Sequence, residues 1–200
     1  MSNPLPEKFY LQDTITVARQ LLGKLLVNTS NGTSGMIVET EAYCGETDKA
    51  CHTYGGRSTD RTSVLYYPPG TAYIYQIYGL YFCLNAVTKK KGVGEAVLIR
   101  ACEPVSGLEQ MMKNRTNMKT GKQPNKKNLT SGPGKLCQAM GITTEYNKSS
   151  LSTGTLRIFD NDPVKDNNIA AAKRIGVDYA EEAKDLLYRF YIKNNPFVSK

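Results

Sequence analysis

The spacing of apolar residues changes from a helical to a strand-like period in the N-terminal part of this chain. Apolar side chains recur every three or four residues over 14–22, and Asp13 precedes that run as a candidate helix cap. Over 25–29 and 34–43 the pattern becomes strand-like, and Asn31-Gly32 lies between the two runs, as in tight hairpins. The pattern therefore predicts one helix followed by a β-hairpin.

A long segment without periodicity, 44–67, follows this hairpin and is rich in Gly, Ser, Thr and Asp. Pro68-Pro69-Gly70 ends the segment with a rigid turn. A loop of that length inside a compact domain is usually functional. We therefore expect a functional surface loop between the first hairpin and the next strand.

The segment 72–85, AYIYQIYGLYFCLN, carries an unusual density of tyrosines in a chain without tryptophan. Alternation along a strand puts Tyr73 and Tyr75 on one face. A reversal at Tyr78-Gly79, where glycine can supply the positive φ of a tight turn, would begin a second strand. The pattern predicts a β-hairpin with Tyr78 on its exposed tip and Leu80 beside it.

The tyrosines of this hairpin need not share one role. Ordinary sheet packing explains Tyr73 and Tyr81. A tip aromatic has no core to enter, so Tyr78 is expected to contact a partner. Apolar wedges carried on hairpins enter the minor groove of DNA and part the base stack in some proteins. Tyr75, one strand position back from the tip, would face whatever nucleotide such a wedge displaced.

Beyond this hairpin the pattern predicts strands and short helices without regular helical crossovers. A strand over 96–102 should end at Pro104, and Ser106 should cap a helix that runs to about Asn114. The other expected elements are a helix over 135–140, a strand over 155–159, a helix around 179–186 and a strand over 188–192. We expect an α+β fold: one compact domain over 1–200, built on a largely antiparallel, curved β-sheet with surrounding helices and a protruding β-hairpin.

Composition excludes several protein classes. Apolar residues make up 40% and charged residues 22% of the 200 residues, which is typical of globular proteins. No apolar run approaches the roughly 20 residues that span a bilayer, and the N-terminus has no secretion signal, so a cytoplasmic, non-membrane protein is expected. Five scattered cysteines favour reduced thiols over disulfides. Adjacent Cys51 and His52 point apart on an extended chain, so neither a metal nor a cofactor is expected.

Positive charge is concentrated in two places. The formal net charge is +8, and the stretch 113–135 contains seven basic residues and no acidic one. A second cluster is formed by Lys89, Lys90 and Lys91. A solvated, flexible loop is the ordinary explanation of such runs, but basic loops beside an aromatic hairpin favour a polyanion as partner. Nucleic acid is the leading candidate.

Two glutamates share a strand face just before the long loop. Alternation puts Glu39, Glu41 and Tyr43 on one side of the strand over 34–43. Carboxylates in an apolar strand are ion-paired, hydrogen-bonded or catalytic. A positioned carboxylate can deprotonate attacking water, which accelerates reactions by roughly 10²–10⁴-fold. The residues alone do not say which glutamate would do this, and a lone loop histidine such as His52 is more often incidental than functional.

Five blocks of the sequence, in order, resemble the alkyladenine DNA glycosylases, also called 3-methyladenine or N-methylpurine DNA glycosylases. The resemblance extends over about 11–199. The blocks are VETEAYCG (38–45), CHTYGGR (51–57), PGTAYIYQIYGLYFCLN (69–85), VLIRACEP (97–104) and SGPGKLCQAMGI (131–142).

The resemblance implies a monofunctional DNA repair enzyme of bacterial type. Such an enzyme flips a damaged purine out of duplex DNA and hydrolyses its N-glycosidic bond, which leaves an abasic site. The implied substrates are 3-methyladenine and 7-methylguanine, with hypoxanthine and 1,N6-ethenoadenine as further candidates. No cofactor is implied. The expected partner is double-stranded DNA with damaged purines, bound by a monomer in the cytoplasm.

The resemblance also assigns the residues of the reaction centre and the base pocket. By family position, Glu41 would be the general base, Arg100 would hold the glutamate, water and nucleotide, and Glu39 would be a structural acid. The residues that would bind the flipped base are Tyr43 and His52 on one side, Tyr75 on the other, and Asn85 at the floor, where it would disfavour the exocyclic amine of guanine.

The DNA contacts implied by the resemblance surround this pocket. Tyr78 would fill the gap left by the extruded nucleotide, and the helix that opens after Ser131 would offer backbone N–H groups to a phosphate. The chain departs from the family pattern at Thr62 and at Leu65-Tyr66, which we expect on the DNA-facing lip. The full set of expected DNA-contacting residues is Tyr78, Arg57, Leu80, Ser131, Gly132 and Lys135.

Two other functions are compatible with the residues. A small-molecule glycosidase or nucleoside hydrolase could use Glu39 and Glu41 as a pair, but the exposed hairpin tip would then have no purpose. A non-catalytic single-strand binder could stack bases on Tyr73, Tyr75 and Tyr81. The first would make Glu39→Gln as damaging as Glu41→Gln, and the second would bind undamaged single strands without releasing a base.

Overall fold

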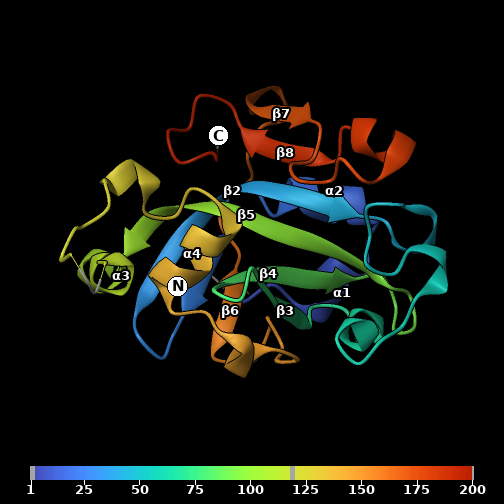
Figure 1. The fold of residues 1–200 in the computed structure, drawn as a ribbon, viewed down its shortest axis with the longest axis horizontal. Coiled ribbons are helices and arrows are strands. Elements are labelled where there is room, and N and C mark those ends of the chain that lie inside the picture. The colour runs from blue at the N-terminus through green and yellow to red at the C-terminus, as the bar shows by residue number, and fades with distance from the viewer. Residues whose placement is uncertain (1–2, 118–119, 200) are drawn as a thin grey trace.

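An antiparallel β-sheet runs through the computed structural model, which describes residues 3–117 and 120–199. Within these residues the main path of the sheet is β3-β4-β5-β2-β1-β6, while β8 pairs with both β2 and β7 (Figure 1). All of these pairings are antiparallel. The strands are β1 (Leu25–Asn28), β2 (Thr33–Tyr43), β3 (Ala72–Ile77), β4 (Tyr81–Thr88), β5 (Glu95–Ser106), β6 (Leu156–Phe159), β7 (Ile169–Ala172) and β8 (Arg189–Ile192).

Short helices cover both faces of the sheet. In Figure 1, α4 lies in front of the strands, whereas α1 and α2 lie behind them. Thr40 in β2 donates a 2.8 Å hydrogen bond to the carbonyl of Ala18, which fixes α2 on the face that Thr40 occupies. The α-helices are α1 (Glu7–Tyr10), α2 (Thr14–Gln20), α3 (Leu108–Arg115) and α4 (Pro133–Met140). The 3₁₀ helices are η1 (Gly45–Thr47), η2 (Tyr54–Gly56), η3 (Thr62–Tyr66), η4 (Lys126–Asn128), η5 (Thr144–Tyr146), η6 (Asp166–Asn168) and η7 (Glu181–Asp185).

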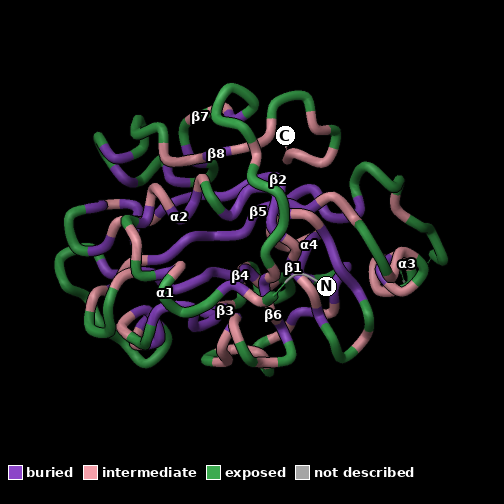
Figure 2. Tube along the Cα trace, turned by 180° about the vertical axis from the view of Figure 1, so that it is seen from behind, coloured by how far each residue is buried: buried purple, intermediate pink, exposed green. Residues whose placement is uncertain are grey.

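The hydrophobic core is formed by the sheet and the helices packed on it, so the central strands are the most buried part of the chain (Figure 2). Leu84 and Ile99 of the sheet belong to one buried cluster with Leu136 and Met140 of α4 and Val17 of α2. Burying a side chain of this kind stabilises a fold by roughly 1.5–3 kcal/mol. The cluster therefore fixes α4 against β4 and β5.

Strand β2 changes its neighbour on one edge halfway along its length. Its first residues, 33–36, pair with β1, whereas 39–41 pair with β8, and β5 follows the other edge. The register between β2 and β5 skips Val38 and then Arg100, so both are bulge positions. Bulges redirect side chains. The result is that Arg100 reaches the carboxylates of both Glu39 and Glu41.

Strands β3 and β4 form the hairpin that the tyrosine pattern predicts. Ile77 pairs with Tyr81, and the Leu80 N–H donates to the Ile77 carbonyl across the turn. Tyr78 and Gly79 both have positive φ angles, 51° and 66°, as the turns favoured in hairpins require. Such a φ is uncommon for a tyrosine. The tip therefore carries local backbone strain at the residue with the most exposed ring.

The prediction that Pro104 ends a strand was wrong. β5 continues to Ser106, since the register with β2 skips Val105 and proline is tolerated beside a bulge. Ser106 is not a helix cap either. Its hydroxyl lies 2.7 Å from the hydroxyl of Ser34, and α3 begins after Gly107, which has a φ of 71° and no side-chain cap.

Other local predictions were corrected as well. The helix expected around 179–186 is the 3₁₀ helix η7. Strand β7 was not predicted, because its sequence, IAAA, has little strand propensity and takes its conformation from pairing with β8. The predicted α+β fold on a curved, largely antiparallel sheet is confirmed.

Three further observations concern classes of protein and site. No helix in the described ranges combines the length and apolar character needed to cross a bilayer. In residues 3–117 and 120–199, no three His, Cys, Asp or Glu side chains gather as potential metal ligands. The five cysteines, Cys44, Cys51, Cys83, Cys102 and Cys137, are free thiols.

Candidate active site

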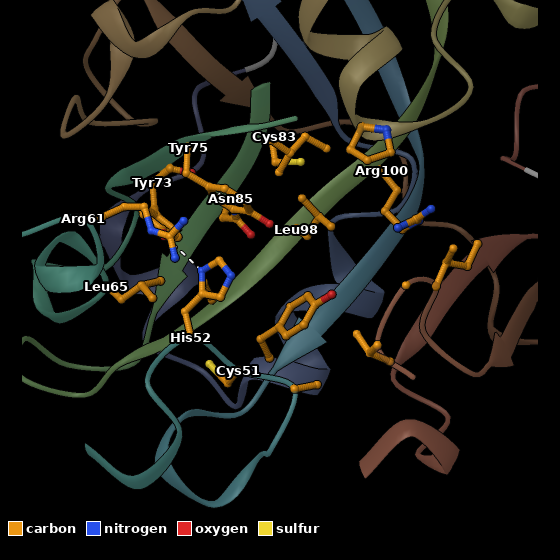
Figure 3. A pocket seen from close by; sticks show the side chains of 18 of the residues that line it. Cys51, His52, Arg61, Leu65, Tyr73, Tyr75, Cys83, Asn85, Leu98 and Arg100 are labelled. Atoms are coloured by element: carbon orange, nitrogen blue, oxygen red, sulfur yellow. Dashed lines mark hydrogen bonds between the residues drawn. The ribbon is translucent and has the colours of Figure 1, made fainter. Parts of the chain in front are cut away.

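A pocket with a volume of about 300 Å³ opens beside strands β3, β4 and β5 (Figure 3). The segment before η2 forms a second wall, and the residues that precede η7 form a third. Ligand sites in proteins usually measure roughly 300–1,000 Å³, so this pocket suits a small ligand. The lining brings together six predicted site residues: Tyr43, His52, Tyr75, Tyr78, Asn85 and Arg100.

Glu41 is fully buried behind groups that line the pocket. Its Oε1 accepts a 2.8 Å hydrogen bond from the Ile175 N–H and lies 3.2 Å from Arg100 Nη1. Its Oε2 accepts a 2.9 Å hydrogen bond from the Tyr43 hydroxyl. A carboxylate has about four acceptor positions. Glu41 is therefore held at both oxygens by three donors, which leaves about one of its acceptor positions unused.

Arg100 bridges two buried carboxylates. Its Nε donates to Glu39 at 3.0 Å, while Nη1 pairs with Glu41 at 3.2 Å. Burial disfavours the charged guanidinium, but the charges of Glu41 and Glu39 outweigh that effect and raise the pKa of Arg100. Removing one partner of a buried ion pair typically costs about 3–5 kcal/mol. The three side chains therefore act as one unit.

Glu39 is also fully buried, and among the described residues neither Glu39 nor Glu41 itself lines the pocket. Its Oε1 accepts hydrogen bonds from Arg100 Nε, from Arg189 Nη1 at 3.1 Å and from the Ser199 hydroxyl at 2.9 Å. Its Oε2 accepts from the Ser199 N–H at 2.7 Å. Of these partners only Arg100 lines the pocket, whereas Arg189 and Ser199 lie outside the lining, in keeping with a structural role.

Tyr43 presents its ring to the pocket and its hydroxyl to Glu41. Burial, and then the charge of Glu41, raise the pKa of Tyr43 well above its ordinary value, so the hydroxyl stays protonated and donates. The guanidinium of Arg174 lies 4.9 Å from the ring centroid. Arg174 is in turn held by Asp48 at 2.5 and 2.8 Å. The ring is therefore fixed from outside the pocket.

His52 completes an aromatic wall with two tyrosines of β3. Its Nδ1 lies 3.0 Å from the Tyr73 hydroxyl, and its ring meets the Tyr75 ring edge-on at a centroid distance of 4.8 Å (Figure 3). Burial, and then the nearby charge of Arg61, lower the pKa of His52, so the ring is neutral at pH 7. Rings at this separation are in contact. A base enclosed between His52 and Tyr75 therefore requires these two rings to move apart.

Residues of β4 and β5 close the inner side of the pocket. Asn85 is buried, and its Nδ2 donates a 3.1 Å hydrogen bond to the Tyr73 carbonyl, which fixes the amide. It lies opposite Leu98 across the β4–β5 pairing. Burial raises the pKa of Cys83 to about 11, so its thiol stays protonated. Fixed polar groups of this kind can reject a ligand group that they cannot pair.

The hairpin tip stands at the mouth of the same pocket. Tyr78 lines the pocket although the residue is 87% exposed, and Leu80 beside it is 75% exposed. Pro133, the first residue of α4, also lines the mouth. The prediction that the Tyr78 ring projects from the molecule is confirmed. Its contact with DNA stays a prediction.

The remaining residues predicted to contact DNA lie outside the pocket lining. Arg57 is exposed, and its carbonyl accepts a 3.0 Å hydrogen bond from the Tyr66 hydroxyl. Ser131 and Gly132 are buried just before α4, and Lys135 is half-buried on its first turn. Their contacts with DNA stay predictions.

The two basic clusters differ in how far they reach solvent. Lys113, Lys122, Lys126 and Lys127 are exposed, whereas Lys119 lies outside the described residues. In the second cluster Lys90 and Lys91 are exposed, while Lys89 is half-buried and pairs with Asp13 at 3.4 Å. The stretch 113–135 is therefore the more open source of positive charge.

Sequence reasoning missed the residues that come from irregular segments. Arg61 and Ile175 line the pocket, and Arg174 with Asp48 braces Tyr43. These residues follow no periodic pattern and belong to no recognisable motif. The one available signal was the presence of Arg61 within the long loop that was expected to be functional.

Two departures from the family pattern prove to be interior residues. Thr62 is 2% exposed and exchanges hydrogen bonds with Thr59. Leu65 is also 2% exposed and packs in a cluster with Tyr73, against which Tyr75 lies. Thr62 and Leu65 are therefore interior positions and Tyr66 is half-buried, so the long loop is not only a surface feature. Leu65 instead supports the aromatic wall.

Comparison with known proteins points to the family that the motifs indicate. A family model described as methylpurine-DNA glycosylase (MPG) matches residues 8–196. A protein of Clostridium acetobutylicum is 53% identical over 201 residues, covering 98% of this chain and 97% of its own length. Proteins of Clostridium perfringens (strain 13 / Type A) and Bacillus cereus (strain G9842) are 51% and 50% identical over 202 and 201 residues, with 98% of both chains covered. Each of the three is named "Putative 3-methyladenine DNA glycosylase". This chain therefore belongs to the methylpurine-DNA glycosylase family, as a DNA repair hydrolase that acts on N-glycosyl bonds.

Proposed function

We propose that this enzyme flips alkylated purine nucleotides out of duplex DNA into the aromatic pocket and hydrolyses the N-glycosidic bond with water activated by Glu41. The main support for the proposal is the relative position of Tyr78, the pocket and Glu41. The exposed Tyr78 stands at the mouth of a pocket whose inner groups, Tyr43 and Arg100, contact a buried carboxylate. A wedge, a base-sized pocket and a proton acceptor are thus arranged along one path.

The hairpin tip supports the flipping step. The target bond is inaccessible inside the base stack, so a glycosylase must extrude the nucleotide at a cost of a few kcal/mol. Side chains inserted between base steps separate them and kink the duplex. The high exposure of Tyr78 supports this role, and the exposed Leu80 beside it extends the apolar tip.

The aromatic wall supports recognition of cationic bases. Alkylation at N3 or N7 leaves the purine positively charged, and electron-rich rings attract cations. The rings of Tyr43, His52 and Tyr75 line the pocket. His52 is neutral at pH 7 because burial and Arg61 lower its pKa, so its ring adds no charge that would repel the base. The base would lie between these rings once His52 and Tyr75 separate.

The Glu41 carboxylate supports the chemical step. As a water oxygen bonds to C1′ of the sugar, Glu41 takes the water proton, and the base departs with the electrons of the N-glycosidic bond. The negative charge of Glu41 also favours the oxocarbenium-like transition state. A cationic base leaves as a neutral molecule, so the reaction needs no separate proton donor. Neutral lesions such as hypoxanthine and 1,N6-ethenoadenine are poorer leaving groups and should react more slowly.

Contacts in the site argue against the two alternative functions. The partners of Glu41, which are Tyr43, Arg100 and Ile175, all line the pocket, whereas Glu39 is held by Arg189 and Ser199 outside the lining and shares only Arg100 with the pocket, so it is a poor second half of a glycosidase pair. Tyr73 is 1% exposed and contacts His52, so it cannot stack bases from a single strand.

Base release from duplexes that each carry one defined lesion tests the proposal. The expected products are free 3-methyladenine or 7-methylguanine and an intact strand with an abasic site. Duplexes with hypoxanthine or 1,N6-ethenoadenine measure whether, and how fast, the enzyme releases neutral bases. Undamaged duplexes and nucleosides are the controls. Release from free nucleosides at the same rate as from duplex DNA, or no release from any lesion, would contradict the proposal.

A further inference from the structure

We propose that Glu39, together with Ser199, is a positioning group that anchors the Arg100 guanidinium from behind and limits its engagement with Glu41. The inference rests on the proposed function, in which Glu41 accepts the proton of water. It assigns a role in the reaction to a carboxylate that never touches the substrate and to a residue near the C-terminus.

The anchor is a dense set of short contacts around one buried carboxylate. Arg100 Nε donates to Glu39 Oε1 at 3.0 Å, and Arg100 Nη2 donates to the Ser199 hydroxyl at 3.2 Å. That hydroxyl donates in turn to Glu39 Oε1 at 2.9 Å, and the Ser199 N–H donates to Oε2 at 2.7 Å. The Ser199 hydroxyl therefore links the Glu39 carboxylate and the Arg100 guanidinium, and the Ser199 N–H adds a second contact to the carboxylate.

This anchor leaves only one nitrogen of Arg100 within ion-pair distance of Glu41. The pair is made by Nη1 at 3.2 Å, while Nε and Nη2 face the anchor. A free guanidinium prefers a two-pronged contact with a carboxylate, which is stronger and more directional. By dividing Arg100 between two acids, Glu39 keeps Glu41 available to accept a proton from water. A stronger ion pair with Arg100 would stabilise the charged form of Glu41 and make its carboxylate a weaker base.

Charge balance points in the same direction. Glu39 neutralises part of the positive charge that faces Glu41, so the field at Glu41 would become more positive without it. Tyr43 contacts Glu41 directly, Arg189 lies opposite it across the β2–β8 pairing, and Arg174 and Cys83 interact with it through space. Within residues 3–117 and 120–199, the titratable and charged groups that contact Glu41, lie opposite it or interact with it or with its partner Arg100 are Glu39, Tyr43, Cys83, Arg100, Arg174 and Arg189.

Glu39→Gln tests the proposal, because it keeps the shape of the side chain and removes its charge. Single-turnover excision of 7-methylguanine would be measured from pH 4.5 to 8.5, at a temperature where the variant is folded. We expect the plateau rate to fall about tenfold and the acidic limb of the profile to move to lower pH by about one unit. Affinity for a duplex with an uncleavable abasic analogue should stay within about twofold, because Glu39 lies behind the pocket.

Ser199→Ala provides a second variant with a milder change in the same network. It removes the hydroxyl shared by Glu39 and Arg100 but keeps the backbone N–H, so we expect a fall of about threefold in the plateau rate. Asn195→Ala is the matched control. Asn195 belongs to the same C-terminal segment but hydrogen-bonds Glu103 at 2.8 Å, outside the network, and its loss should leave the profile unchanged.

The outcomes separate this inference from the proposed function. If the wild-type enzyme releases no base, the proposed function fails. If the wild type is active and Glu39→Gln is merely less stable, with an unchanged plateau and an unchanged acidic limb, the positioning role is overturned. If Glu39→Gln does not fold, the plateau rate and acidic limb of Ser199→Ala test the positioning role instead. A Ser199→Ala profile identical to that of Asn195→Ala would then overturn the positioning role.

Discussion

The hydroxyl of Tyr43 donates a 2.9 Å hydrogen bond to the carboxylate of Glu41, two residues earlier on the same strand. Alternate residues of a strand share a face. One strand therefore fixes the distance between a ring that lines the pocket and the acid behind it. Contact with a base and activation of water would be coupled through this pair, without any loop in between.

Glu41→Gln is expected to lower the rate of base excision by at least about 100-fold, because an amide cannot take the proton of the attacking water. Binding of lesion-containing duplex should persist, since Glu41 is fully buried. Single-turnover kinetics and fluorescence anisotropy measure the two quantities. Glu145→Gln, at an exposed glutamate of η5, is the control. Appreciable turnover by Glu41→Gln would remove it from the role of base.

Tyr78→Ser is expected to slow single-turnover excision from fully paired duplexes by about tenfold or more, because the variant loses the ring that would occupy the gap in the stack. The defect should shrink when the lesion is placed opposite a mismatch, where extrusion costs less. Tyr67→Ser, at another exposed tyrosine, serves as the comparison. Equal rates for Tyr78→Ser and the wild type on paired duplexes would contradict the wedge.

Asp48→Asn is expected to lower the free energy of unfolding by about 3 kcal/mol, because it leaves the buried Arg174 without its ionic partner. Asp48 contacts Arg174 at 2.5 and 2.8 Å, and both side chains are almost fully buried. Urea unfolding measures the change. Asp185→Asn removes an exposed ion pair with Lys173 and should have little effect. Equal stability of the two variants would show that the buried pair does not brace the fold.

The lone histidine makes a pH prediction simple to test. The pKa of His52 is lowered by burial and then by Arg61, whereas in the unfolded chain it is about 6.5. Between these values the unfolded state binds more protons, so stability should fall as pH drops below about 6.5. His52→Gln should flatten this part of the profile. Urea unfolding from pH 5 to 7.5 measures it, and an unchanged slope in His52→Gln would contradict the shift.

Affinity for DNA should fall steeply with salt, because neutralised phosphates release counterions. Replacing Lys126 and Lys127 by Gln should reduce the slope of log affinity against log salt by up to about 2 units. Lys184→Gln, at an exposed lysine of η7, is the control. An unchanged slope in the double variant would show that this part of 113–135 does not touch phosphates.

Local patterns predicted much of the fold and the centre of the candidate site. Strict alternation and a Tyr-Gly step were enough to predict the β3–β4 hairpin, because a two-residue period and a positive-φ turn are properties of short segments. The same alternation put Glu39, Glu41 and Tyr43 on one face, in agreement with the contacts of both acids to Arg100.

What the sequence did not reveal depends on contacts between distant segments. The bulge at Arg100 arises from the pairing of two strands far apart in the chain, and no local signal marks it. The hydrogen bond from the Ser199 N–H to Glu39 joins residues 160 positions apart in the sequence. Arg174 belongs to an irregular segment after β7, so its contact with the Tyr43 ring forms only when the whole chain is folded.

Strand β2 is paired on both edges where it carries Glu41, with Leu98 of β5 on one side and Arg189 of β8 on the other. A residue in the middle of a sheet cannot travel without breaking backbone hydrogen bonds on two sides. The acid is therefore held in place, and in the proposed reaction the nucleotide would move to Glu41 rather than Glu41 to the nucleotide. Weakly paired purines would leave the base stack more often than undamaged ones. The first discrimination between damaged and normal bases would therefore take place in the double helix, before the enzyme contacts the base.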